Sequence, residues 1–182
     1  GVVSHKLGMS RPVTAVDIQA YSKLLSNVLL TAQPNHLDVV EEASFWKAVE
    51  KVTSEVRQLI QPLLVLEEDA IVSASLGKPE HLIELVEFGS LAVDAQRRLK
   101  RCPGRVAKQL KLVNEVLSTS KFSTADLTAT LNFGGPYFSY SQTIVLDAIA
   151  ITSSKCGAAE RQAINAVLLS TASEIVNTVG KQ

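Results

Sequence analysis

Apolar side chains recur every three or four residues along most of this chain, which is the spacing that places them on one face of an α-helix. Between residues 37 and 61, Val49, Val52 and Val56 follow this spacing, while Glu50 and Glu55 fall on the other side. The pairs Thr14–Asp17 and Ser123–Asp126 resemble helix-capping boxes, with Asp in place of the usual Glu. The pattern predicts helices over residues 14–33, 37–61, 63–76, 80–101, 106–117, 123–132, 144–151 and 158–179.

Proline and glycine separate these segments. Pro62 ends or kinks a helix because its ring clashes with a preceding carbonyl group, and Gly77 is expected to form a left-handed cap. Pro79 is well suited to the first turn of the helix that follows. Further breaks are expected at Pro34-Asn35, Cys102-Pro103-Gly104, Gly134-Gly135-Pro136 and Gly157.

Residues 144–151 are almost all apolar, so their periodicity alone is compatible with either a helix or a buried strand. We favour a helix, because the chain offers no other segment that would pair with a strand. The sequence therefore predicts an all-α protein: an N-terminal arm over residues 1–12, then one domain over residues 13–182. That domain is expected to be an antiparallel bundle of about seven or eight helices with short connections that contain Pro or Gly.

Composition agrees with a folded, soluble domain. The chain has 182 residues, of which 46% are hydrophobic and 20% charged, and this argues against disorder. No apolar run approaches the roughly 18–20 residues needed to cross a bilayer, and no signal peptide opens the chain. The sequence starts at Gly1 rather than Met, so a targeting segment removed upstream is compatible with it, and the compartment stays open.

Charge is neutral overall, with 18 basic and 18 acidic side chains, but it is unevenly distributed. Residues 38–94 hold twelve acids against four bases, and residues 95–121 hold eight bases against one acid. The candidate partner-binding surface of the basic segment consists of Arg97, Arg98, Lys100, Arg101, Arg105, Lys108 and Lys111.

Two interpretations of this asymmetry compete. In the first, the basic segment lies beside acidic helices of the same chain, and the charges cancel in space. In the second, it contacts the acidic face of a protein partner or of a second copy of this chain. Nucleic acid or an anionic membrane is a third kind of partner, which the neutral net charge and the absence of aromatic residues from the basic segment, residues 95–121, do not favour.

No catalytic or metal-binding motif is present. His5, His36 and His81 form no metal-ligand spacing, and no nucleophile elbow or phosphate loop occurs. The run Glu67-Glu68-Asp69 lacks the alternating ligands of a calcium loop and is interpreted as a solvated turn. We therefore expect no catalytic residue, no metal and no cofactor.

The two cysteines leave two questions open. Whether Cys102 and Cys156 form a disulfide depends on the compartment, which the sequence does not give. Cys102 lies among basic residues that would lower the pKa of its thiol, so a reactive thiol is one reading. The other reading, which we favour, is an incidental cysteine at a helix end.

Residues 132–140 hold four of the nine aromatic residues of the chain. Phe133, Tyr137, Phe138 and Tyr140 either plug the end of the bundle or cover a pocket for a small apolar molecule. If a pocket exists, we expect it at this loop and at residues 144–151, with Trp46 as a further candidate lining residue.

These observations favour a non-enzymatic interaction domain that binds a protein partner or itself through its acidic and basic segments. The alternative is a carrier of a hydrophobic small molecule, such as a lipid or pigment, held under the aromatic loop. The third hypothesis is binding of a polyanion or an anionic membrane through the basic segment.

Overall fold

The structure, a computed structural model, describes residues 9, 20–31, 33–92 and 102–176. Within these residues all regular structure is helical, which confirms the predicted all-α helical bundle. Apart from Met9, the expected N-terminal arm and the Thr14–Asp17 cap lie outside the described residues. The elements are α2 (Ala20–Thr31), the 3₁₀ helix η1 (Pro34–Glu41), α3 (Ala43–Leu59), α4 (Gln61–Ser75), α5 (Glu80–Phe88), α6 (Gly104–Ser118), α7 (Thr128–Phe133), α8 (Tyr140–Ser153) and α9 (Ala158–Ile175).

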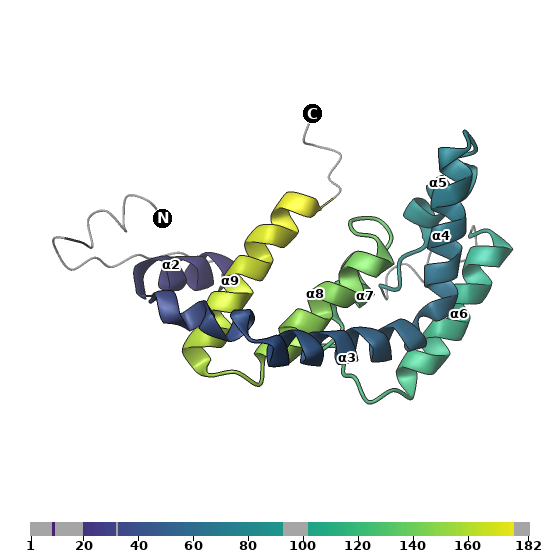
Figure 1. The fold of residues 1–182 in the computed structure, drawn as a ribbon. Helices are drawn as coiled ribbons and strands as arrows, with labels where there is room; N and C mark the ends of the chain where they lie inside the picture. Colours follow the sequence, from purple (N-terminus) through teal and green to yellow (C-terminus); the bar gives the residue numbers. More distant parts are fainter. Residues whose placement is uncertain (1–8, 10–19, 32, 93–101, 177–182) are drawn as a thin grey trace.

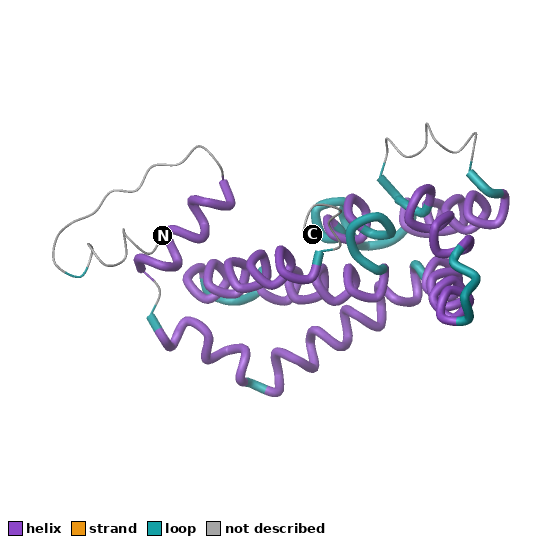
Figure 2. Tube along the Cα trace, turned by 90° about the horizontal axis from the view of Figure 1, so that it is seen from above, coloured by secondary structure: helices purple, strands orange, loops and turns teal. Residues whose placement is uncertain are grey.

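Helix α8 lies at the centre of the arrangement and packs against α3, α4, α7 and α9 (Figure 1). Helices α2 and η1 pack against α9 at one end of the molecule, whereas α4, α5 and α6 pack together at the other end. Seen from above, α3 and α8 link these two groups (Figure 2). This central position explains why residues 144–151 are almost all apolar, since a helix covered on several sides has little solvent-exposed surface. Within this segment Val145 remains exposed, at 39%.

One apolar core runs through the bundle. Phe45, Val49, Val52 and Val56 are buried along one face of α3, at the spacing that the sequence pattern predicted. They pack with residues of α4, α5, α6 and α8, including Ile60, Leu63, Leu85, Val106, Leu110, Val113 and Ile144. Gly77 follows α4 in the left-handed conformation (φ +80°), so the predicted cap is confirmed.

Helix α8 begins four residues before the predicted segment. Ser139 forms a capping box with Gln142: its hydroxyl accepts from the Gln142 N–H (3.2 Å), and its own N–H donates to Oε1 of Gln142 (3.0 Å). Tyr140, expected in the aromatic loop, is therefore the first residue of a helix. Its phenol O–H donates to the carbonyl of Gly89 and ties α8 to the end of α5.

Several predicted helices are shorter or divided. The helix expected over residues 123–132 begins at Thr128, and the one expected over residues 158–179 ends at Ile175. The helix expected over residues 80–101 ends at Phe88, because the chain turns at Gly89 to meet Tyr140; residues 93–101 lie outside the described part. The helix expected over residues 37–61 is split at Glu42, whose backbone is extended. The Val40 carbonyl at the end of η1 accepts a hydrogen bond from the Trp46 indole instead of continuing an α-helical ladder.

Candidate ligand-binding site

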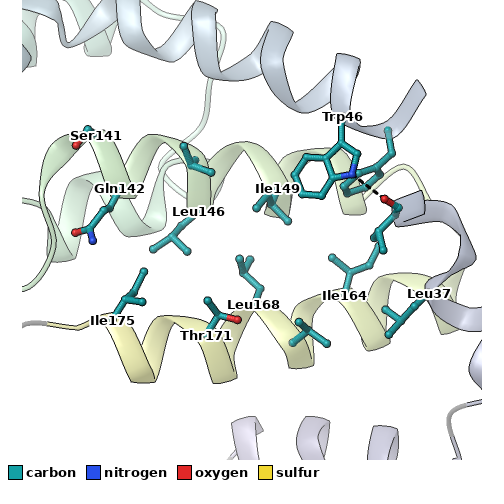
Figure 3. A pocket seen from close by; sticks show the side chains of 14 residues that line it. Leu37, Trp46, Ser141, Gln142, Leu146, Ile149, Ile164, Leu168, Thr171 and Ile175 are labelled. Carbon is teal, nitrogen blue, oxygen red and sulfur yellow. Dashed lines mark hydrogen bonds between the residues drawn. The ribbon is translucent and has the colours of Figure 1, made fainter. Parts of the chain in front are cut away.

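An apolar groove of about 550 Å³ lies between α8 and α9. Figure 3 shows side chains from the two helices facing each other across this space, with Trp46 at one end. The lining residues come from η1, α3, α8 and α9: Leu37, Val40, Phe45, Trp46, Ser141, Gln142, Val145, Leu146, Ile149, Ile164, Val167, Leu168, Thr171 and Ile175.

The two walls are antiparallel helices held by their connecting turn. Gly157 precedes α9 and donates its N–H to the carboxylate of Glu160 (2.8 Å), which caps the helix. The Ser153 hydroxyl bridges the walls, because it lies 2.8 Å from the Ala150 carbonyl and 3.0 Å from Oδ1 of Asn165. These bonds place the apolar residues Ile164, Val167 and Leu168 of α9 opposite α8. Ile164 lies near the end of the groove that Trp46 closes.

Trp46 closes one end of the groove. Its indole N–H donates to the Val40 carbonyl (2.7 Å), and its ring meets that of Phe45 edge-on with centroids 5.4 Å apart. The side chain is nevertheless 45% exposed. An anchored ring with one open face is suited to contact with a bound molecule.

The groove presents apolar surface to solvent and no charge. Among the described residues that line it, no side chain is ionisable, and the polar ones, Ser141, Gln142 and Thr171, lie away from Trp46. Val167 remains 50% exposed and Ile175 41% exposed. Covering such surface is favourable by roughly 25 cal/mol per Å² of apolar area.

A second cavity of about 330 Å³ adjoins the polar end of the groove, and Gln142 and Ile175 line both. Its walls come from α4, α5 and the turn before α8, and they include Glu67, Tyr137 and Phe138. This cavity is more polar than the groove, because it combines a carboxylate with a phenol and the Ser139 side chain.

Glu67 is a buried carboxylate that caps a helix of a different segment. Its Oε1 accepts the N–H of Tyr140 (2.7 Å), and its Oε2 accepts the N–H of Ser141 (3.2 Å). Burial raises the pKa of Glu67, and these two hydrogen bonds oppose the shift. The interpretation of Glu67-Glu68-Asp69 as a solvated turn is therefore wrong for Glu67, which lies on the core face of α4 with Leu63 and Ala70; Glu68 and Asp69 are exposed.

Asp147 has the same role at the start of α7. Its two carboxylate oxygens accept the N–H groups of Ala129 and Thr130, each at 2.8 Å. Burial raises the pKa of Asp147, again opposed by these hydrogen bonds. Two buried acids thus satisfy helix N-termini that would otherwise leave donors unpaired inside the protein.

These shifts predict pH dependences of opposite sign. The pKa of Asp147 is raised on folding. Its contribution to the free energy of unfolding is therefore complete below the ordinary pKa and is lost as the pH rises through the pKa of the folded protein. Hydrogen bonds from Ser123 lower the pKa of Asp126, so its contribution is present above the ordinary pKa and is lost as the pH falls.

Urea unfolding between about pH 3 and pH 7 measures both effects. The free energy of unfolding of the wild type minus that of Asp147→Asn should fall as the pH rises. The corresponding difference between the wild type and Asp126→Asn should increase as the pH rises. Slopes of the same sign would contradict this assignment.

The structure distributes the aromatic candidates over different places. Trp46 lines the groove, Tyr137 and Phe138 line the second cavity, and Tyr140 is fully buried in the core. Phe133 is 43% exposed and meets the Tyr137 ring edge-on, with centroids 6.0 Å apart. Residues 144–151 do line the groove, through Val145, Leu146 and Ile149.

The basic candidates are only partly described. Arg97, Arg98, Lys100 and Arg101 lie outside the described residues. Nε of Arg105 lies 3.2 Å from the Glu84 carboxylate, and Nζ of Lys111 lies 4.0 Å from that of Glu115. Lys121 pairs with Glu55 at 2.8 Å, and Lys108 is exposed. Arg105 and Lys121 thus pair with acids of residues 38–94, as the first interpretation of the charge asymmetry expects.

The remaining candidate chemistry is less marked. Cys102 and Cys156 are free thiols, and burial raises the pKa of each, opposite to the lowering that nearby bases would produce at Cys102. Among the residues that the structure describes, no three His, Cys, Asp or Glu side chains come together as a metal site requires. No helix in that part of the chain is long and apolar enough to cross a membrane.

Comparisons with protein-family models, with curated proteins and with solved structures find no match for this chain. The groove and the cavity beside it are therefore the features of the fold that bear on function.

Proposed function

We propose that this chain binds a hydrophobic small molecule in the groove between α8 and α9. The observation that carries the proposal is a groove of about 550 Å³ whose lining is almost entirely apolar and partly exposed. Its volume lies within the roughly 300–1,000 Å³ typical of small-molecule sites. The antiparallel helical walls make it elongated: from Ile164 to Ile175, at 1.5 Å per residue, α9 extends about 16 Å.

The character of the lining favours binding over catalysis. Its three polar side chains are one amide and two hydroxyls, and no ionisable group lies among the lining residues to act as acid or base. An elongated apolar groove with polar groups at one end matches a molecule that has a hydrocarbon chain and a small polar head. This proposal corresponds to the carrier hypothesis, with the tail site at α8 and α9 instead of under the aromatic loop.

Titration with octanol, decanol and dodecanol tests the proposal. Trp46 is the only tryptophan and lines the groove, so its fluorescence reports on this site. Because each buried methylene contributes about 0.8 kcal/mol, the affinity should increase about fourfold per methylene. Affinity that does not depend on chain length, or no change in fluorescence and thermal stability with any alcohol, would contradict the proposal.

A second candidate function, association with another copy of this chain, is supported by a separate surface. On α4 and α5, the exposed apolar side chains of Val72, Leu76 and Ile83 lie on the same helices as the exposed acids Glu68 and Glu87. Such a surface complements the basic segment, residues 95–121, of a second copy.

Sedimentation velocity at low and high salt tests this association. The wild type should dimerise at low salt, and salt should weaken the dimer. The double variant Glu68→Lys, Glu87→Lys should weaken it about tenfold, since each substitution turns an attraction into a repulsion. Glu174→Lys, on α9, is the control for a change of charge elsewhere. A wild type that stays monomeric at every concentration would contradict this function.

A further inference from the structure

We infer that the molecule bound here is a cationic amphiphile, with its hydrocarbon tail in the groove and an ammonium head in the second cavity beside Glu67. The inference rests on the proposed small-molecule function and adds the chemical class of the ligand. It depends on how the two cavities meet and on which groups line the smaller one.

The two cavities adjoin where an amphiphile changes from tail to head. Gln142 and Ile175 line both, at the end of the groove that lies away from Trp46. A chain that lies along α9 with its apolar end at Trp46 therefore directs its other end to Gln142. Beyond Gln142 lies the cavity of about 330 Å³ between α4, α5 and the turn before α8.

Glu67 gives this cavity the capacity to bind a cation. It is the one carboxylate among the described residues that line either cavity. Each of its oxygens accepts one backbone N–H, from Tyr140 or Ser141, and a carboxylate has about four acceptor positions. Acceptor capacity consequently remains for a bound ammonium group, whose charge would compensate that of the buried carboxylate.

The other side chains of the cavity suit the same head. Tyr137 and Phe138 line it together with Glu67, and aromatic faces attract ammonium groups through their quadrupoles. Helices α4 and α5, which line the cavity, carry six acids and no Lys or Arg, and one of these acids, Glu84, pairs with Arg105 of α6. The remaining negative charge favours a positive ligand.

An anionic head finds no cationic partner at this end among the described residues. Glu67 already accepts the Tyr140 and Ser141 N–H groups at the start of α8, and the Ser139 hydroxyl accepts that of Gln142. Among the residues that the structure describes, the lining contains no Lys, Arg or His side chain. A fatty-acid carboxylate would thus approach the Glu67 carboxylate without a cation that compensates their repulsion.

Three probes with the same tail test the inference: dodecylammonium, dodecanol and dodecanoate, each titrated against Trp46 fluorescence below its micellar concentration. We expect the ammonium to bind about tenfold more tightly than dodecanol, and dodecanoate to bind more weakly than both. Glu67→Gln should reduce the ratio of ammonium to dodecanol affinity to about one. Glu68→Gln, a change of an exposed acid on the same helix, should leave the ratio unchanged.

Tyr137→Leu keeps the inference testable if Glu67→Gln does not fold, because Tyr137 is 47% exposed and makes little contribution to the core. It should lower the ammonium-to-dodecanol ratio severalfold. Equal affinity for all three probes, or a ratio insensitive to both substitutions, would overturn the inference and leave the small-molecule function standing. Failure of all three to bind would overturn both.

Discussion

Glu67→Ala is expected to lower the free energy of unfolding by about 2–4 kcal/mol. The substitution removes the acceptor of the Tyr140 and Ser141 N–H groups, and the Tyr140 N–H is buried. A buried donor without a partner costs about 1–3 kcal/mol. Urea unfolding measures the change.

Glu68→Ala is the matched control, since it removes an exposed carboxylate from the adjacent position of the same helix. Its effect should stay within about 0.5 kcal/mol. Native-state hydrogen exchange adds a local measurement: in Glu67→Ala the amides of Tyr140 and Ser141 should exchange faster, while amides in α6 keep their relative protection. Equal stability of the two variants would remove the role assigned to the Glu67 carboxylate.

The helices were predictable because their signals are local. The stripe of Val49, Val52 and Val56 lies within one helix, and the Gly77 cap needs only its own backbone. The early start of α8 has a local signal that was missed, the capping box of Ser139 and Gln142. The end of α5 was wrong for a non-local reason: the Tyr140 hydroxyl meets the Gly89 carbonyl, although the two residues are far apart in the sequence. Nothing in either segment alone indicates this contact.

The burial of the two acids was indicated by their positions in the sequence pattern, although their residue type suggested exposure to solvent. Glu67 falls at helical spacing between Leu63 and Ala70, so its position predicted the core although its charge suggested solvent. Asp147 is the one charged residue in the apolar segment 144–151. In both cases the partner that makes burial favourable is the N-terminus of another helix, which becomes apparent only once the helices are packed.

The groove was predictable in its parts but not as a site. The stripe of Ile164, Val167 and Leu168 and the apolar segment 144–151 were both apparent in the sequence, and each is compatible with complete burial in a core. Packing leaves Val167 half exposed, because the two helices do not close over this part of their surface. The same side chains that complete a core elsewhere in the bundle form a binding surface here.

Val167→Asp is expected to weaken dodecanol binding about 100-fold. Val167 lines the groove and is 50% exposed, so an aspartate is tolerated while the groove is open to water. A bound hydrocarbon chain would cover the carboxylate without offering it a hydrogen bond, and this desolvation costs several kcal/mol. Aspartate is preferable to lysine for this test, since a long side chain would move its charge out of the groove. Trp46 fluorescence measures the affinity.

Val72→Asp is the matched control, because Val72 lies on α4 outside both cavities and is 54% exposed. Both substitutions place an aspartate in a helix at a half-exposed valine, so their effects on folding should be similar. The two variants should therefore unfold at similar urea concentrations, and only Val167→Asp should lose affinity for the alcohol. Equal affinity in both variants would place any bound alcohol outside the groove between α8 and α9.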